Sequence, residues 1–481
     1  MKKNIKWLLL VSLSFVACNN DDETVAETPV TAGSANFSKY VALGDSFAAG
    51  YSDGALFKKG QDNAYPSVLA LQFKQAGGGD FTTPYMEDNL GGFSSGGNQV
   101  PQFPRRSYFN GAAPATVSGT SATVLGSHVS GTASYNNMGV PGARSYHLLA
   151  PGYGNPSGLV TSPPTANPYF VRFASSNSTS ILADALTQQP TFFSLWIGGN
   201  DVLGYATSGG DDSSPITPAT GVPGVGFDGS YNALVAQLST GGRKGVVANL
   251  PYINTLPFFT TVGYNPATLD ATQAGQLNAG YAPYNAGLVN AKNAGFITEA
   301  ERVRRTINFV AGKNAVVMVD EYLTNLAGAG LPSYRQTTVD DFIVLVSQGV
   351  SAKAHLTAGN GTAVPLQDRW VVSKDEVALL KTATDSYNIT IEAAATANGL
   401  AFVNAKAIMD QLVNGGIRFG NYHMSATYVT GGAFSLDGIH PSARGYALIA
   451  NKFLEAINAK YGSTLRPVDL GNYQIQYPAS L

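Results

Sequence analysis

The chain has 481 residues, of which 44% are hydrophobic and only 12% are charged, against about 25% charged residues in a typical soluble protein. Its formal net charge of -2 becomes -5 once the three lysines of an N-terminal leader are removed, and nothing in this mildly acidic balance favours nucleic acid as a partner. A single cysteine excludes an internal disulfide, so stability must come from a hydrophobic core, for which this length is ample.

The start of the chain has the pattern of an export signal. Lys2, Lys3 and Lys6 precede an apolar run over residues 7–17 that is too short to span a bilayer. The run ends at Cys18, the only cysteine, in a sequence that resembles the lipobox of bacterial lipoproteins. We expect residues 1–18 to be a signal peptide and lipidation site, with a lipid anchor on Cys18. A signal peptide cleaved nearby, with an incidental cysteine, is the alternative.

Residues 19–37 are polar and contain several Thr, Ala and Pro residues, which predicts a flexible tether. The acidic run at residues 21–23 resembles the signal that sends some bacterial lipoproteins to the outer cell surface, although such a run is more often simply solvated. The expected location is therefore the bacterial outer membrane, with the protein held there by its lipid.

Strand-like and helix-like runs alternate along the rest of the chain. Apolar runs predict strands at residues 40–43, 192–197, 244–250, 315–319 and 400–403. Helical patterns cover residues 65–75, 277–294, 299–310, 373–398 and 442–461. The helix at 373–398 opens with the capping box Ser373-Lys374-Asp375-Glu376 and ends at Gly399. Alternation of this kind predicts an α/β fold with a mostly parallel central sheet covered on both faces.

Three segments exceed what such a sheet needs. Residues 77–133 and 203–229 are rich in Gly, Ser, Thr and Pro and predict loop-rich excursions, and residues 252–372 predict a largely helical insertion. These segments either line the functional site or lie on the surface far from it. The motifs described next lie near both ends of the chain, so we expect one domain over residues 38–465, followed by a tail over residues 466–481.

Four short motifs follow one another along this domain: Gly44-Asp45-Ser46, Asn137-Met138-Gly139, Gly198-Gly199-Asn200-Asp201 and Asp437-Gly438-Ile439-His440. The first and third come directly after strand-like runs, at the end of a parallel strand where side chains meet solvent. Each motif alone is an ordinary turn or helix-cap signal. Unrelated turn signals have no reason to occur in this order and context, so together they favour a catalytic site.

The residue types in these motifs fit nucleophilic catalysis. A serine hydroxyl such as that of Ser46 is a weak nucleophile until a base takes its proton. His440 can be that base, with Asp437 orienting its ring. The tetrahedral intermediate then needs hydrogen-bond donors for its oxyanion, which Gly139 and Asn200 can supply.

This set of motifs resembles the SGNH hydrolase family, also called the GDSL esterase/lipase family. The resemblance implies a three-layer α/β/α fold with Ser46 as nucleophile and with Asp437 and His440 completing a catalytic triad. It also implies an oxyanion hole formed by the Ser46 N–H, the Gly139 N–H and the Asn200 side chain. It spans nearly the whole mature chain, and no cofactor is implied.

One residue of the first motif departs from the family pattern. Phe47 stands where Leu is usual, at a position that serves mainly in packing.

Other candidate centres are weaker. Residues 92–96 satisfy the G-x-S-x-G pattern, but they lack the preceding apolar strand that gives this pattern meaning and are interpreted as loop. The remaining histidines are His128, His147, His355 and His423. None has metal-ligand spacing, so no metal site is predicted. His147 lies closest to the Gly139 motif and is the one candidate for lining a cleft.

The expected activity is hydrolysis of carboxylic esters of the lipase/esterase type through an acyl-enzyme, with a small-molecule or polymeric ester as substrate. The runner-up is a carbohydrate acetylesterase acting on acetylated polysaccharide. A hypothesis from another class is a non-catalytic surface lipoprotein that binds glycan or a partner protein, for which a broken triad would be typical. No obligate protein partner is implied.

Overall fold

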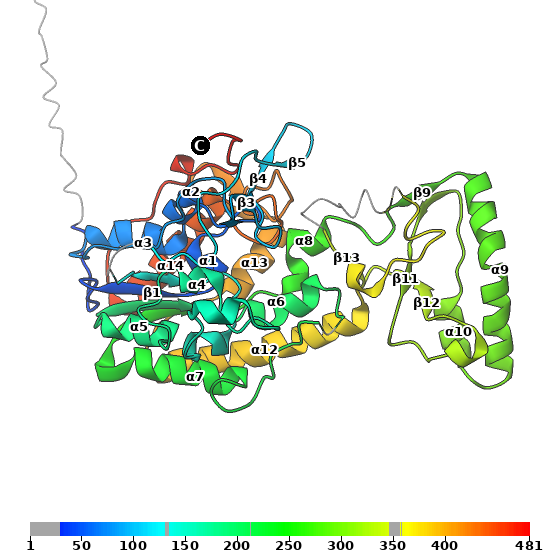
Figure 1. The fold of residues 1–481 in the computed structure, drawn as a ribbon, viewed down its shortest axis with the longest axis horizontal. Coiled ribbons are helices and arrows are strands. Elements are labelled where there is room, and N and C mark those ends of the chain that lie inside the picture. The colour runs from blue at the N-terminus through cyan, green and yellow to red at the C-terminus, as the bar shows by residue number, and fades with distance from the viewer. Residues whose placement is uncertain (1–28, 130–133, 212, 346–355, 357) are drawn as a thin grey trace, which may run out of the picture.

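The computed structural model describes residues 29–129, 134–211, 213–345, 356 and 358–481. At its centre is a parallel sheet with the strand order β15-β8-β7-β1-β6 (Figure 1). In chain order these strands are β1 (Tyr40–Gly44), β6 (Asn137–Gly139), β7 (Phe192–Trp196), β8 (Lys244–Ala248) and β15 (Ala401–Val403).

Strands β1 and β7 are buried along their whole length, as expected for central strands of a sheet that is covered on both faces. Gly44, the last residue of β1, pairs with Gly139 of β6 on one side and Trp196 of β7 on the other. A Cβ atom at Gly44 would lie 2.5 Å from the Trp196 carbonyl oxygen, so only glycine fits. The strand ends are thereby aligned at one edge of the sheet.

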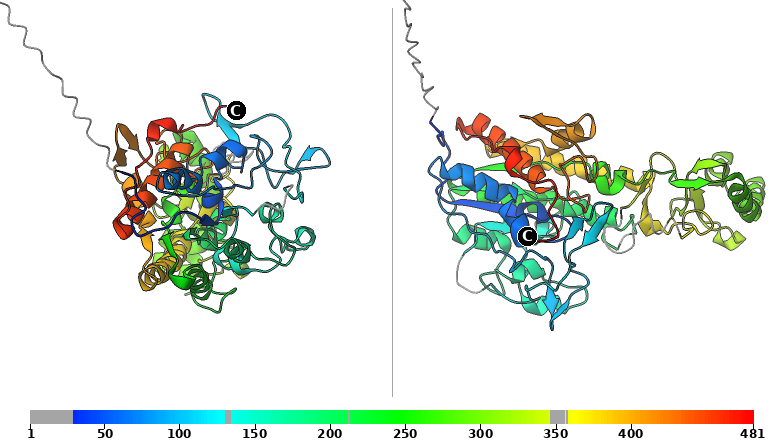
Figure 2. Two further views of the ribbon diagram at one scale, coloured as in Figure 1. Left: turned by 90° about the vertical axis from the view of Figure 1, so that its left-hand side faces the viewer. Right: turned by 90° about the horizontal axis from the view of Figure 1, so that it is seen from above.

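Helices cover both faces of this sheet (Figures 1 and 2). Helices α3 (Tyr65–Lys74) and α14 (Ala443–Tyr461) pack together on one face. Helices α5 (Ile181–Thr187), α7 (Phe227–Leu238) and α12 (Lys374–Ala397) lie on the other. The three-layer α/β/α architecture expected from the sequence is confirmed.

The long helices end where their capping residues predict. The Ser373 hydroxyl accepts a hydrogen bond from the Glu376 N–H, and the Glu376 carboxylate accepts one from the Ser373 N–H, which makes the expected capping box of α12. Helix α14 begins after Ser442, whose hydroxyl accepts from Gly445 N–H, and ends before Gly462, whose φ of 67° is left-handed.

Shorter elements complete the body of the molecule. The helices are α1 (Ser46–Ala49), α2 (Lys58–Asp62), α4 (Pro168–Val171), α6 (Asn200–Thr207), α8 (Pro257–Thr260) and α13 (Ala405–Val413). The antiparallel pairs are β2 (Ser94–Ser95) with β3 (Asn98–Gln99), β4 (Ser107–Phe109) with β5 (Pro114–Thr116), and β16 (Ile417–Phe419) with β17 (Tyr422–Met424). Two of these hairpins lie in the 77–133 excursion. The 203–229 excursion includes the end of α6 and the start of α7.

The insertion at residues 252–372 projects from the body as an arm (Figures 1 and 2). Among its described residues, the helices beyond α8 include α9 (Ala271–Asn293) and α10 (Glu299–Arg305). Its hairpins pair β9 (Ala267–Leu269) with β10 (Gly312–Asn314), β11 (Val317–Val319) with β12 (Tyr334–Gln336), and β13 (Phe342–Ile343) with β14 (Val371–Val372). The insertion is therefore mixed rather than largely helical, and the strand expected at 315–319 lies here, outside the central sheet.

Helix α10 is shorter than its sequence predicts because two asparagines of α9 hold the chain after it in an extended form. Asn285 exchanges two hydrogen bonds with the backbone of Ile307, and Asn278 does the same with Phe309. Both apolar side chains are buried in this position. Packing against α9 thus overrides the local helical pattern.

The two ends of the described chain pack onto the body. Ser34 donates to the carbonyl of Tyr461, and the ring of Phe37 stacks on Phe73 at 4.1 Å, so the expected tether is anchored over residues 31–37. In the C-terminal tail, Tyr477 is buried and Arg106 donates to the Pro478 carbonyl oxygen.

Cys18 and the rest of the leader lie outside the described residues. In the part of the chain that the structure describes, no helix combines the length and the hydrophobicity needed to cross a membrane.

Candidate active site

Ser46, His440 and Asp437 lie in one chain of hydrogen bonds at the carboxyl edge of the sheet. The His440 Nε2 atom is 2.8 Å from the Ser46 hydroxyl oxygen, and His440 Nδ1 is 2.9 Å from Asp437 Oδ2. All three side chains are nearly buried, with Ser46 5%, His440 8% and Asp437 5% exposed. Residues almost four hundred positions apart are therefore in the contact that nucleophile, base and orienting carboxylate require.

The Asp437 carboxylate is held by four donors. Its Oδ1 accepts from the N–H groups of Ile439 and His440, and its Oδ2 accepts from the Gly54 N–H and the His440 ring. Burial opposes its charge, but the interaction with His440 and the backbone donors together keep the pKa of Asp437 below its ordinary value. Asp437 is therefore ionised at neutral pH, as a partner for an imidazolium must be.

A clamp joins the segment after Ser46 to the loop that carries Asp437. The Asp53 N–H donates to the Ser435 hydroxyl at 2.9 Å, and the Leu436 N–H donates to Asp53 Oδ1 at 2.8 Å. The Ser52 hydroxyl donates to the Pro441 carbonyl. These contacts bring the two ends of the domain together.

Ser46 is the first residue of the short helix α1, directly after β1. The first N–H groups of a helix have no partner within the helix. Asp45 caps one of them by accepting from the Phe47 N–H at 2.9 Å, and burial raises the pKa of Asp45 to about 7. The Ser46 N–H has no hydrogen-bond partner among the described residues, so it is free to donate to an oxyanion.

Asn200 is the first residue of α6 and follows the end of β7. One hydrogen of its amide donates to the Ala143 carbonyl oxygen at 3.0 Å, which leaves the second available. The next residue, Asp201, accepts from both the N–H and the hydroxyl of Ser145, each at 2.8 Å. This buried carboxylate ties the loop after β6 to α6.

The geometry does not favour the predicted oxyanion role of Gly139. Its N–H already donates to the Asn137 side chain at 3.0 Å, and Gly139 lies within β6. A Cβ atom here would be 2.3 Å from the Ala49 N, so glycine is required for close packing of β6 against α1. The constraint on Gly139 is steric.

Sequence reasoning missed Gly142, three residues further on. It lies in the turn after β6, in which the Ala143 N–H donates to the Val140 carbonyl, with a φ of 79° and an exposed surface. Within the described part of the chain its N–H has no partner. Since Asn200 bonds to the neighbouring Ala143, this free donor lies beside the amide of Asn200. The Pro141-Gly142 pair, a type II turn signal directly after a strand, is the feature that could have revealed it.

The other candidates from the sequence are engaged in structural contacts. Ser94 of the G-x-S-x-G pattern is buried and donates to the Thr123 carbonyl. His147 accepts from the Arg144 N–H and stacks on Tyr153, and burial, with the nearby Arg144 charge, lowers the pKa of His147 to about 4. It is therefore neutral. His355 lies outside the described residues.

His128 and His423 bond to backbone carbonyl groups. Among the residues that the structure describes, no group of His, Cys, Asp and Glu side chains could hold a metal ion.

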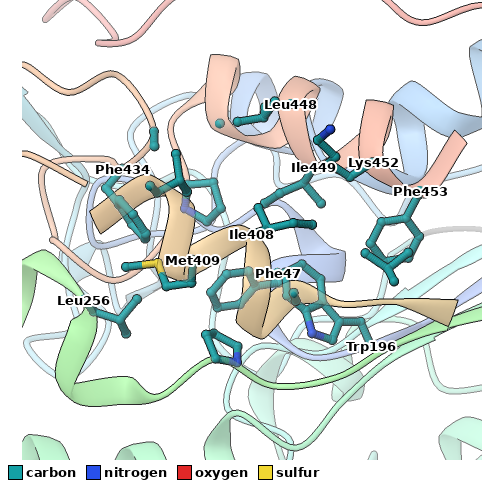
Figure 3. A pocket seen from close by; sticks show the side chains of 17 residues that line it. Phe47, Trp196, Leu256, Ile408, Met409, Phe434, Leu448, Ile449, Lys452 and Phe453 are labelled. Carbon is teal, nitrogen blue, oxygen red and sulfur yellow. The ribbon is translucent and has the colours of Figure 1, made fainter. Parts of the chain in front are cut away.

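Two apolar pockets adjoin the site and share a wall formed by Phe47, Trp196, Pro251 and Leu256. The proximal pocket, about 510 Å³, is lined further by residues including Asp45, Gly199, Leu203 and Ile439. The distal pocket, about 620 Å³, lies between α13 and α14 and is lined further by residues including Ile408, Met409, Pro441, Ile449 and Lys452 (Figure 3). Both volumes include space open to solvent. Phe47 is thus more than a packing residue, because it borders both pockets.

Comparison with known proteins agrees with this geometry. The chain matches the model of the GDSL-like lipase/acylhydrolase family over residues 40–453, which includes all four motifs. No curated protein sequence and no solved structure gives a significant match. Because the family match covers most of the chain and implies an ester-hydrolysing enzyme, this protein belongs to the GDSL-like lipase/acylhydrolase, or SGNH hydrolase, family.

Proposed function

We propose that the enzyme hydrolyses carboxylic esters through an acyl-enzyme formed on Ser46. The observation that carries the proposal is the continuous hydrogen-bond chain from the Ser46 hydroxyl through His440 to Asp437. His440 Nε2 takes the hydroxyl proton as the oxygen attacks the ester carbonyl, and returns it to the departing alcohol. Water then attacks the acyl-enzyme by the same route, which releases the acid and restores Ser46.

In this proposal the oxyanion is stabilised by three donors. They are the N–H groups of Ser46 and Gly142 and the second amide hydrogen of Asn200, all of which are unoccupied among the described residues. Donors placed in advance need no reorganisation when charge develops on the carbonyl oxygen. Gly142 replaces Gly139 in this role.

The proposal includes a pH dependence. Because the pKa of Asp437 is below its ordinary value, Asp437 remains ionised as the solution becomes mildly acidic. Activity should still fall with pH, since a protonated His440 cannot accept the serine proton. A rate that stays constant throughout the acid range would contradict the role of His440 as base.

Substrates of the lipase/esterase type fit better than acetylated polysaccharide. The two pockets are lined almost entirely by apolar side chains, as an acyl group longer than acetyl would require. An acetyl group would leave them empty. Carbohydrate acetylesterase is therefore the less favoured candidate.

The location of the enzyme is a further part of the proposal. We infer from the leader sequence that Cys18 carries a lipid that anchors the protein in the bacterial outer membrane. The Cys18→Ser variant should then appear in the soluble fraction and lose incorporation of labelled fatty acid. Equal membrane association of both forms would refute the anchor.

A fluorophosphonate probe tests the enzymatic role directly, because only an activated serine reacts with it efficiently. The wild-type protein should be labelled at Ser46, and the Ser46→Ala variant should not. The same variant should lose nearly all hydrolysis of p-nitrophenyl esters. Ser94→Ala is the matched control, since Ser94 belongs to a serine motif that lies outside the proposed site. Equal hydrolysis by Ser46→Ala and wild type would refute the proposal and favour a non-catalytic binding protein.

A further inference from the structure

The proximal pocket is lined by residues that are next in sequence to three members of the proposed reaction centre. It is lined by Asp45, Gly199 and Ile439, each of which directly precedes one of the three functional residues Ser46, Asn200 and His440. This apolar pocket therefore adjoins the backbone that carries Ser46, Asn200 and His440.

The distal pocket continues from the same wall. The Phe47 ring is 5.4 Å from the His440 ring and 5.0 Å from the Trp196 ring, and both pockets border Phe47 and Trp196. Pro441, the residue after His440, lines the distal pocket. Figure 3 shows the α13 and α14 side chains pointing into the space beside Phe47. Together the two pockets make an apolar path that leads away from the site.

The lining of the distal pocket favours an uncharged chain. Lys452 is the one charged side chain lining the distal pocket within the described residues, and its ammonium is 2.8 Å from Glu455, so its charge is already balanced. The rest of that lining is apolar, with Ile408, Met409 and Ile449 among it. A hydrocarbon chain gains free energy with each methylene that it buries in such a space.

We infer that the two pockets form one acyl-binding channel, in which the first carbons of the acyl chain occupy the proximal pocket and longer chains extend past Phe47 into the distal pocket. This inference rests on the proposed function and specifies its substrates as esters of medium- and long-chain fatty acids. The alcohol part of the ester remains on the solvent side of His440.

Chain-length profiles test the channel. With p-nitrophenyl esters from acetate to palmitate, kcat/KM of the wild type should rise by about fourfold for each added methylene until the channel is filled. Ile408→Trp and Ile449→Trp, each at a partly buried position, should lower the dodecanoate-to-acetate ratio of kcat/KM by about tenfold or more. Leu203→Trp, in the proximal pocket, should lower the ratio already for butyrate. Each ratio is independent of the fraction of folded enzyme.

Val413→Trp is the matched control, because Val413 ends α13 but is 45% exposed and lines neither pocket. It should leave the ratio unchanged. A wild type that prefers acetate, or an unchanged ratio in both Ile408→Trp and Ile449→Trp, would overturn the channel. Failure of the proposed function would give a different result from failure of the channel. In that case no ester, not even the acetate, would be hydrolysed in a Ser46-dependent way.

A separate observation concerns the clamp behind Asp437. Asp53 is 2% exposed, and its φ of 53° is left-handed, a conformation that Asp and Asn tolerate better than most residues. This conformation lets Asp53 bond to Ser435 and Leu436 while the next N–H, of Gly54, reaches Asp437. The second carboxyl oxygen of Asp53 has no partner among the described residues.

We propose that Asp53 is the positioning residue for Asp437 and acts through its hydrogen bonds to the 435–437 loop. Burial, with Asp437 nearby, raises the pKa of Asp53 to about 7, which limits repulsion between the two carboxyl groups. The conservative variant Asp53→Asn keeps the acceptor oxygen and the tolerance for a left-handed φ. Asp53→Ala loses both.

The test compares kcat per active site, counted by fluorophosphonate titration. Asp53→Ala should lower kcat by about tenfold with KM nearly unchanged, because the 435–437 loop loses a hydrogen bond that holds Asp437 against His440. Asp53→Asn should restore most of the loss. Gln189→Ala is the matched control for backbone strain alone, since Gln189 has a φ of 52° far from the 435–437 loop. Wild-type kcat in Asp53→Ala, or equal losses in Asp53→Ala and Asp53→Asn, would overturn this role.

Discussion

The body of the molecule and its projecting insertion are stabilised in different ways. In the body, one continuous apolar cluster extends from β1 through β7 and β8 to α14. At its base the insertion shares this cluster through residues such as Phe258 and Phe259, but further out its apolar side chains form small separate clusters, such as the one around Met318 and Ile343. A small core buries too little surface to stabilise its segment alone, so the insertion needs other interactions.

Buried ion pairs supply these further interactions in the insertion. The Arg335 side chain is 2% exposed and lies between two carboxylates, with bonds to Asp320 and a bidentate pair to Asp341 at 2.7 and 2.8 Å. Burial alone would raise the pKa of Asp341, but the Arg335 contacts lower it. Asp341 also accepts from the Lys374 N–H at the start of α12. The network therefore ties the insertion to a helix that lies under the central sheet.

Among the described residues, the two regions meet at the base of the insertion and where Arg304 of α10 pairs with Asp375 of α12. The Phe258 N–H of α8 donates to the Gly438 carbonyl in the loop of Asp437 and His440, and Leu256 lines both pockets. Helices α9 and α10 lie at the far end of the insertion (Figure 1). The comparison indicates that changes in the body near Ser46 affect chemistry, whereas changes in the outer insertion affect stability.

The largest expected effect is on chemistry in the body. His440→Ala should lower kcat/KM for p-nitrophenyl butyrate by about 10⁴-fold or more, because the Ser46 hydroxyl loses its base. Thermal unfolding should change little, since His440 packs at the edge of the core. Activity within tenfold of the wild type would show that another group takes the serine proton.

The next effect should be on the stability of the insertion. Arg335→Ala removes the charged partner of buried Asp341 and leaves Asp320 with Arg304 as its remaining partner. Breaking a buried ion pair in this way costs about 3–5 kcal/mol. We expect faster limited proteolysis within residues 252–372, while kcat for p-nitrophenyl acetate remains unchanged. The control is Arg302→Ala, because the Arg302–Glu299 pair lies at the protein surface and should contribute little to stability. A matching loss of kcat in Arg335→Ala would contradict the separation of the two regions.

Two asparagines, one in each region, allow the same substitution to be compared in the body and in the insertion. Asn200→Ala should lower kcat by about 10²–10³-fold with little change in melting temperature, because it removes an oxyanion donor. Asn278→Ala, in the insertion, removes both hydrogen bonds to Phe309 and should lower stability without changing kcat. Steady-state kinetics and thermal melts of both variants measure the two effects. A loss of kcat in Asn278→Ala, or a loss of stability in Asn200→Ala, would contradict the prediction.

The smallest effect is a pH dependence of stability at the junction of the two regions. Glu376 of α12 is fully buried, and burial raises its pKa to about 8. The unfolded chain releases this proton at lower pH than the folded chain, so the stability contributed by Glu376 is complete in acid and is lost as pH rises towards 8. Glu376→Gln should therefore raise the melting temperature by about 2 °C or more at pH 8 and have less effect at pH 5. An equal shift at both pH values would exclude a buried, protonated Glu376.

Local sequence signals predicted the elements whose ends are capped or whose faces are uniformly apolar. Strand β7 and helices α3, α12 and α14 lie close to their predicted bounds. Strand β6 escaped prediction because its residues Asn137–Gly139 are few and partly polar, and only pairing with β1 makes them a strand. Helix α10 was predicted too long because contacts with α9 decide where it ends.

For the site, the sequence by itself determined which side chains can do the chemistry. Ser46, Asn200, Asp437 and His440 stand in motifs whose order identifies the family, and these side chains gather at one edge of the sheet. The types of these residues and the order of their motifs can be read directly from the sequence, without knowledge of the fold.

Only the tertiary structure decided which donors are free and which space is open. The Gly139 N–H is occupied by Asn137, whereas the Gly142 N–H has no partner among the described residues, and for this reason we propose Gly142 in its place. The paired pockets beside Phe47 likewise depend on α6, α13 and α14 packing around one ring. Hydrogen-bond occupancy and cavity shape arise from contacts between distant segments, and no single stretch of sequence contains them.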